Sequence, residues 1–273
     1  MRLDRAVHAR GYARSRSHAQ ELIALGSVLV DGLVETKASR DVADGDLIEL
    51  SGPLDSYVSR AAHKLLGALE AFASEGLEVA GKRALDAGAS TGGFTQVLLE
   101  RGVTQVTAVD VGHDQMSPAV AADPRVILIE GLNVRDMEAG SPGSGADVVV
   151  ADLSFISLAM VLPALRKVAA PHADFLLLVK PQFEVGRGGL DKHGVVVSPA
   201  ARADAVALVC ARAQAEGLSV RGVAQSSLPG SSGNVEFFVW VSESWQARGA
   251  AAPRTLSGAG LAAAISSLVE GTP

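Results

Sequence analysis

The sequence has little cysteine and few aromatic residues, and these two scarcities already exclude some classes of protein. Its 273 residues include one cysteine, Cys210, and only 4% Phe, Trp and Tyr, so the cores should be aliphatic. A single cysteine cannot form an intramolecular disulfide and is typical of a reducing compartment. Because Cys210 lies in the apolar helical repeat "ADAVALVCARAQAEG", we expect a buried packing residue and not a nucleophile.

Long apolar runs are absent, and so is a signal peptide. No run approaches the roughly 20 residues that a membrane helix needs. The stretch "FLLLV" at 175–179, for example, has only the length of a strand. The opening stretch "MRLDRAVHARG" is charged throughout, unlike a secretory signal. We therefore expect a cytoplasmic protein with no membrane partner.

An overall excess of positive charge is also missing, but basic residues gather at one end of the chain. The net charge of −6 argues against a wholly basic nucleic-acid binder. Residues 1–20 nevertheless contain five arginines and a single acid, Asp4. Such a run can be no more than a solvated face, yet at the end of an acidic chain it indicates an anionic partner. The candidate RNA-binding residues are Arg2, Arg5, Arg10, Arg14, Arg16 and His18.

The first fifty residues contain the pattern of a small α+β domain. Two helical stretches, "RLDRAVHARG" and "SRSHAQELIALG", precede three strand-like runs, "SVLV", "LVET" and "DLIEL". Asp31-Gly32 and Asp44-Gly45 separate these runs, and Asp-Gly between apolar runs is a strong hairpin signal. With the linker "SGPLDSY", this pattern predicts a domain over residues 1–58.

The rest of the chain alternates between apolar strands and amphipathic helices. This alternation predicts a parallel sheet covered on both faces over residues 59–244. The last two strands, "LSVRGVAQS" and "NVEFFVWVSE", are joined only by a turn-rich stretch and should form an antiparallel hairpin. Such an α/β fold resembles the Rossmann-like class I methyltransferase sheet. We expect residues 245–273 to be a flexible tail with a short helix at "GLAAAISSLVEG".

The stretch "LDAGASTGGF" at 85–94 has two interpretations. As G-x-S-x-G it could be the nucleophile elbow of a serine hydrolase, with Ser90 as nucleophile. That interpretation requires a later acid and a later histidine at strand ends. The candidate histidines are His113, His172 and His193, and no histidine follows the last strands. The alternative, a cofactor site, is favoured by the strands that come next.

Four consecutive strands each end in a polar residue, which is more specific than one glycine-rich loop. The glycines let the backbone approach a ligand. Asp110, at the second strand end, is placed to bind both hydroxyls of a ribose, and Asn133 with Val134 could meet an adenine edge. The glycine spacing departs from the dinucleotide pattern, but S-adenosylmethionine has no pyrophosphate and does not need it. The candidate cofactor residues are Asp86, Gly88, Ser90, Gly92, Gly93, Phe94, Asp110, Asn133, Val134 and Asp152, and we predict no metal site.

Six stretches make residues 1–243 resemble the TlyA family, in which an S-four-type (alpha-L) RNA-binding domain is fused to an FtsJ-like ribose methyltransferase. They are "RLDRAVHARGYARSRSHAQELI", "YVSRAAHKLLGALEAF", "LDAGASTGGFTQVLLERG", "VADLSFISL", "LLLVKPQFEVGR" and "GNVEFFVW". The resemblance implies 2′-O-methylation of ribose, typically of cytidine, in ribosomal RNA of the small or large subunit or both. It implies S-adenosylmethionine as methyl donor, and ribosomal RNA or subunits, not DNA, as partner.

The resemblance also implies a catalytic Lys-Asp-Lys-Glu set, matched here by Lys64, Asp152, Lys180 and Glu236. Lys180 would orient or deprotonate the 2′-hydroxyl, the two acids would fix the lysines, and Lys64 would help to hold the substrate. Glu236 interrupts an apolar strand, where an unpaired acid would be costly. Two non-enzyme interpretations stay open: an RNA-binding or ribosome-assembly protein, and a cytolysin, because members of the family are often labelled hemolysins.

Overall fold

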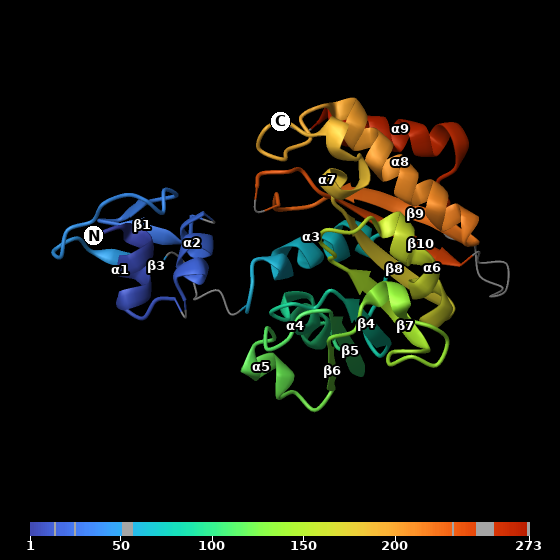
Figure 1. The fold of residues 1–273 in the computed structure, drawn as a ribbon, viewed down its shortest axis with the longest axis horizontal. Coiled ribbons are helices and arrows are strands. Elements are labelled where there is room, and N and C mark those ends of the chain that lie inside the picture. The colour runs from blue at the N-terminus through green and yellow to red at the C-terminus, as the bar shows by residue number, and fades with distance from the viewer. Residues whose placement is uncertain (14, 25, 51–56, 231, 244–253, 272–273) are drawn as a thin grey trace. The chain divides into compact units, whose positions relative to one another are not determined.

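The computed structural model consists of two compact units, Met1–Arg60 and Ala61–Pro273. It describes residues 1–13, 15–24, 26–50, 57–230, 232–243 and 254–271, which Figure 1 draws as ribbon. The division falls two residues after the predicted boundary at residue 58. Each unit has its own hydrophobic core, so each is described separately below.

The smaller unit consists of two helices and a three-stranded sheet. The two-residue turn Asp31-Gly32 has positive φ at both positions (53° and 77°), which is the geometry of a tight hairpin. Ser15 accepts a hydrogen bond from the main-chain N–H of His18 and so caps the second helix. The sheet order is β2-β1-β3, with both pairs antiparallel. The elements are α1 (Leu3–Ala9), α2 (Arg16–Ala24), β1 (Val28–Val30), β2 (Leu33–Val34) and β3 (Ile48–Leu50).

The larger unit is built on a seven-stranded sheet of order β6-β5-β4-β7-β8-β10-β9. The neighbours from β6 to β8 are parallel, and β10 is antiparallel to both β8 and β9. The parallel sheet and the antiparallel pairing of β9 with β10 agree with the prediction from the sequence pattern. The strands are β4 (Arg83–Ala87), β5 (Gln105–Asp110), β6 (Val126–Glu130), β7 (Ala146–Ala151), β8 (Ala169–Val179), β9 (Leu218–Gln225) and β10 (Phe237–Glu243).

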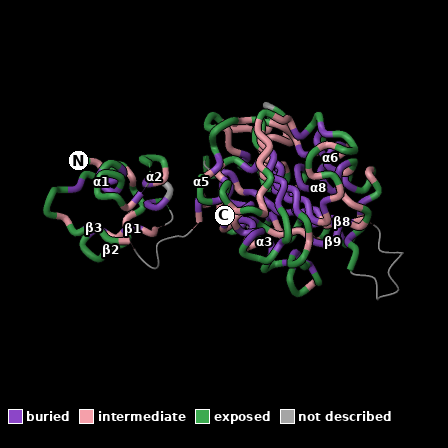
Figure 2. Tube along the Cα trace, turned by 90° about the horizontal axis from the view of Figure 1, so that it is seen from below, coloured by how far each residue is buried: buried purple, intermediate pink, exposed green. Residues whose placement is uncertain are grey.

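Helices cover both faces of this sheet, and Figure 2 shows the buried residues concentrated inside the unit. Val239 of β10 joins the core beneath α6, α8 and α9. The alternate residues Phe238 and Trp240 meet Phe94 and Phe72 on the opposite face, beneath α4 and α3. The helices are α3 (Ala61–Ala73), α4 (Gly93–Glu100), α5 (Pro118–Ala121), α6 (Leu158–Val168), α7 (Pro181–Glu184), α8 (Pro199–Ala215) and α9 (Gly258–Glu270), with 3-10 turns η1 (Val134–Asp136) and η2 (Arg187–Gly189).

Cys210 is a packing residue of α8. Its side chain is fully buried in the main core, and burial raises the pKa of the thiol to about 12. A thiol in this state is not ionised at neutral pH, so it is inert as a nucleophile. The interpretation from the helical repeat is therefore confirmed.

The prediction of a flexible tail is wrong for residues 254–271. The expected helix is present as α9, but its apolar residues Leu261, Ile265 and Val269 recur every four positions and are buried in the core. Before it, Leu256 forms a β-bridge to Val220, and Arg221 donates a hydrogen bond to Thr255 at 2.7 Å. Residues 245–253 lie outside the described residues. No helix in the described part of the chain is long and apolar enough to span a membrane.

Candidate active site

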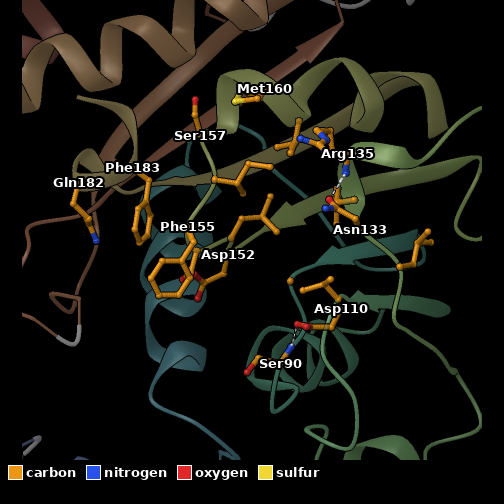
Figure 3. A pocket seen from close by; sticks show the side chains of 18 of the residues that line it. Ser90, Asp110, Asn133, Arg135, Asp152, Phe155, Ser157, Met160, Gln182 and Phe183 are labelled. Atoms are coloured by element: carbon orange, nitrogen blue, oxygen red, sulfur yellow. Dashed lines mark hydrogen bonds between the residues drawn. The ribbon is translucent and has the colours of Figure 1, made fainter. Parts of the chain in front are cut away.

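A cavity of about 980 Å³ opens at the carboxyl ends of β4, β5 and β7 (Figure 3). Parallel strands bring their carboxyl ends to one edge of a sheet, so residues distant in sequence meet there. Six of the ten candidate cofactor residues line this cavity: Gly88, Ser90, Asp110, Asn133, Val134 and Asp152. The cavity edge is thus formed by the strand ends that the sequence pattern singles out.

Asp110 is held in place by two main-chain donors. The N–H of Ser90 donates to Oδ2 and the N–H of Gly112 donates to Oδ1, both at 2.8 Å. Each oxygen keeps a further acceptor site, because a carboxylate offers about four. The carboxylate is therefore fixed in orientation and can still accept hydrogen bonds from two vicinal hydroxyls.

The geometry around Ser90 does not provide a serine nucleophile with a base. Ser90 has a positive φ of 45°, and its Oγ lies 3.2 Å from Oε1 of Gln115. A glutamine amide cannot take up the hydroxyl proton, so this contact does not activate the serine. Ser90 instead contributes its main-chain N–H to the Asp110 carboxylate.

Gly88 marks a close approach of two loops. Its φ is +87°, and a Cβ there would lie 2.7 Å from the main-chain oxygen of Asp152. Any side chain at this position would therefore clash with the backbone that follows β7. The residue leaves the floor of the cavity open to a ligand, which is the role expected of a cofactor cradle.

The other four candidate cofactor residues are not in the cavity lining. Asp86 is fully buried and accepts a hydrogen bond from Thr95 at 2.6 Å, which ties α4 to β4. Burial raises the pKa of this carboxyl to about 7. Gly92 and Gly93 begin α4, and the ring of Phe94 stacks on Phe238 with centroids 6.2 Å apart. Their contacts with a cofactor stay predictions.

The four candidate catalytic residues form two ion pairs. Lys180 Nζ lies 2.6 Å from Asp152 Oδ1 and donates to Ser154 Oγ at 2.9 Å. Lys64 Nζ, from α3, lies 2.5 Å from Glu236 Oε2, and these two residues are only 5% and 2% exposed. Both acids thus fix a lysine, as the resemblance implies.

The two ion pairs lie at the same end of the sheet, where β7 and β8 have their carboxyl ends. Phe237 of β10 is the register partner of Val179 of β8, so Glu236 and Lys180 occupy the next position of these two strands. Asp152 directly follows β7, which is the other neighbour of β8. Strand pairing therefore delivers three of the four residues to one place, and α3 supplies the fourth.

Two further residues at this edge were not expected from the sequence. Phe155 lines the cavity with 92% of its surface exposed, has a positive φ of 64°, and meets Phe183 of α7 with ring centroids 5.3 Å apart. Glu184, at the end of α7, accepts hydrogen bonds from Ser157 and Leu158. The stretch "VADLSF" points to the strand end, but no sequence signal distinguishes Phe155 as the exposed member.

The basic residues of the smaller unit have partners within it. Asp4 is fully buried and accepts from Arg2 at 3.1 Å and from Arg16 at 2.9 Å. The hydrogen bonds from these arginines and from Gln20 hold the pKa of the Asp4 carboxyl well below its usual range. Arg2 and Arg16 therefore stabilise the fold of this unit, whatever else they contact.

The remaining candidate RNA-binding residues differ in what they touch. Arg10 donates to the main-chain oxygens of Asp44 and Asp46. Arg5 is exposed, and its side chain has no hydrogen-bonding or ionic partner within the described part of its unit. The main-chain N–H of His18 is bound by Ser15, and Arg14 lies outside the described residues. Within the described residues, no group of three or more metal-ligating side chains is assembled.

Comparisons with known proteins identify the family. The model of the FtsJ-like methyltransferases matches residues 57–243, and that of the S4 domain matches residues 1–48. The 16S/23S rRNA (cytidine-2′-O)-methyltransferase TlyA of Mycobacterium tuberculosis is 51% identical over 241 residues, which are 88% of this chain and 89% of that protein.

Two further relatives cover most of the chain. Hemolysin A of Brachyspira hyodysenteriae is 41% identical over 197 residues, which are 72% of this chain and 80% of that protein. A solved structure from Streptococcus thermophilus is 32% identical and covers 99% of this chain and 94% of its own, with a TM-score of 0.74. The chain belongs to the TlyA family, with an S4 domain followed by an FtsJ-like methyltransferase domain.

Proposed function

We propose that this protein transfers the methyl group of S-adenosylmethionine to the 2′-hydroxyl of a cytidine in ribosomal RNA. The observation that carries the proposal is the set of two lysine–acid contacts at the carboxyl ends of the strands, Lys180 with Asp152 and the buried pair Lys64 with Glu236. The relative from Mycobacterium tuberculosis is named for cytidine-2′-O-methylation of both 16S and 23S rRNA. Cytoplasmic ribosomal subunits are accordingly the proposed partners.

The cavity suits a nucleoside with two ribose hydroxyls. Asp110 would accept hydrogen bonds from both hydroxyls, and Asn133 with Val134 would line the adenine edge. Gly88 leaves the cavity floor free of side-chain atoms. When bound, S-adenosylmethionine supplies a methyl group already activated by its sulfonium. The chain therefore has to align the acceptor, and alignment supplies most of the rate enhancement.

Lys180 is the residue placed to act on the acceptor hydroxyl. A protonated lysine has three N–H donors; Lys180 donates one to Ser154 Oγ, and its charge lies 2.6 Å from Asp152 Oδ1. A further N–H would orient a 2′-oxygen that lies next to Asp152 and Ser154 in the cavity. In the neutral form, the same nitrogen would accept the hydroxyl proton. The pH dependence of kcat separates these two roles, because only the general base requires loss of a proton from Lys180.

Two surfaces suit an RNA partner. The exposed ring of Phe155 presents a face on which an unstacked nucleobase can stack. In the S4 domain, Arg5 is free of internal ion pairs in the described part and can neutralise a phosphate. Arg2 and Arg16 bind Asp4 within the domain while part of each side chain stays exposed.

Alkaline hydrolysis tests the acceptor atom. A 2′-O-methyl group removes the nucleophile that alkali uses to cleave the adjacent phosphodiester. Ribosomal RNA methylated with labelled S-adenosylmethionine should therefore release the label in an uncleaved dinucleotide. DNA of the same sequence, which has no 2′-hydroxyl, should stay unlabelled. Lys180→Ala should bind S-adenosylmethionine normally and transfer no label. Label in mononucleotides with a methylated base would overturn the ribose assignment.

A further inference from the structure

Lys180 connects two segments of the methyltransferase unit. The first is the loop of residues 152–157 after β7, and the second is α7, which begins directly after Lys180. Lys180 joins them at one end through Asp152 and Ser154. Glu184 joins them at the other end, because Oε2 accepts from Ser157 Oγ at 2.5 Å and Oε1 accepts from the N–H of Leu158 at 2.7 Å.

Glu184 uses both carboxylate oxygens on the first turn of α6. Ser157 is the N-cap of that helix, and its Oγ accepts from the N–H of Ala159 at 3.1 Å. The hydroxyl of Ser157 thus accepts from its own helix and donates to Glu184, while Glu184 also satisfies a second helical N–H directly. A helix cap requires only one such acceptor, and the side chain that adds the second comes from α7.

A strained residue lies between the two links. Phe155 has a φ of +64°, a conformation that a non-glycine side chain adopts only when its surroundings impose it. Ser154 is fixed to Lys180 on one side, and Ser157 is fixed to Glu184 on the other. The ring of Phe155 extends to Phe183, one residue before Glu184 (Figure 3).

We propose that Glu184 is a positioning residue for methyl transfer. It fixes loop 152–157 against α7 and so holds the Phe155 ring at the cavity wall and the Lys180 ammonium beside Asp152 and Ser154, which line that wall. The inference rests on the proposed function, because it assigns Glu184 to that same reaction. The hydrogen bonds of Glu184 are with Ser157 and Leu158, whereas Asp110 is held by Ser90 and Gly112, so loss of Glu184 should change kcat and leave cofactor binding intact.

The test compares three changes at this link with a matched control. Glu184→Ala removes both contacts and should lower kcat for RNA methylation by about tenfold or more, the scale of a small misplacement of reacting groups. Glu184→Gln should restore most of that loss, because its amide can accept from Leu158 and donate to Ser157. Ser157→Ala keeps only the Leu158 contact and should give an intermediate kcat. The Kd for S-adenosylmethionine should stay within about twofold in all three.

Ser198→Ala is the control, because Ser198 caps α8 in the same way and touches neither segment. It should lower the melting temperature by the loss of one cap hydrogen bond and leave kcat unchanged. Wild-type kcat in a folded Glu184→Ala variant would overturn the proposal, as would an equal loss in Glu184→Gln or in Ser198→Ala. If Glu184→Ala does not fold, an unchanged kcat in Ser157→Ala overturns it. A wild-type protein that methylates no RNA would instead contradict the proposed function.

Discussion

Replacing Glu236 by alanine should destabilise the methyltransferase unit as well as stop methyl transfer. Lys64 and Glu236 are 5% and 2% exposed, so the substitution leaves a buried ammonium without its counter-charge. Removing one partner of a buried pair costs about 3–5 kcal/mol. For a unit of roughly 200 residues, each kcal/mol lowers the melting temperature by about 2–4 °C. Glu236→Ala should therefore melt about 6–20 °C below the wild type.

Urea unfolding followed by tryptophan fluorescence measures this loss in the right unit. The chain has two tryptophans, Trp240 and Trp245, and neither lies in the sequence of the S4 domain. Trp240 lies in β10, the strand that directly follows Glu236, and its indole N–H donates to Asp174 at 2.9 Å. Fluorescence is accordingly blind to the S4 domain, and the transition reports the unit that contains the catalytic residues.

The double variant Lys64→Met/Glu236→Leu separates stability from catalysis. Replacing a buried ion pair by apolar side chains of similar size is often neutral or stabilising, so most of the lost stability should return. Methyl transfer should not return, because both charges are gone. An unchanged urea midpoint in Glu236→Ala would refute the burial argument. A double variant that methylates RNA at the wild-type rate would refute the catalytic role of the pair.

Three further predictions concern other parts of the chain. Asp110→Ala should weaken S-adenosylmethionine binding by about 1–3 kcal/mol, roughly 5- to 150-fold in Kd; calorimetry showing unchanged affinity would remove Asp110 from the site. Burial raises the pKa of Asp86 to about 7 from 3.8, so the folded state binds a proton more tightly than the unfolded state. The free energy of unfolding of the wild type should then fall as the pH rises between these values. Asp86→Asn can still accept the hydrogen bond from Thr95, so urea titrations of this variant should show no such fall. The same pH dependence of stability in both proteins would contradict the prediction. Ile265→Ala in α9 should cost about 2–5 kcal/mol of unfolding free energy, and an unchanged urea midpoint would mean that the helix is not part of the core.

Strand ends could be predicted from the sequence because a buried parallel strand is a continuous apolar run. Asp110 and Asp152 follow such runs, and both reach the cavity. The hairpin of the S4 domain could be predicted from Asp31-Gly32, because a tight turn requires positive φ and these two residue types adopt it readily. Lys64 and Glu236 were assigned to the catalytic Lys-Asp-Lys-Glu set from the family resemblance. Their pairing could not be predicted from a local pattern, because the two residues are 172 positions apart.

Contacts between side chains that are distant in sequence could not be predicted from the sequence pattern. Asp4 reads as one acid among arginines, yet it is the buried acceptor that Arg2 and Arg16 share. The tail was expected to be flexible because it is rich in small residues, and the surface that covers α9 is formed by α8 and β9, far from it in sequence. Glu184 was missed because its partners lie on another segment.

Strand β10 is the last strand of the described chain, yet it lies between β8 and β9 and not at the edge of the sheet. During synthesis, β8 and β9 are therefore made before the strand that separates them, and each has an open edge that can pair wrongly or aggregate until β10 arrives. Glu236 directly precedes β10, so its ion pair with Lys64 forms in the same event. We therefore expect closure of the sheet and completion of the catalytic set to occur together, and a nascent chain that has not yet reached residue 236 to have neither.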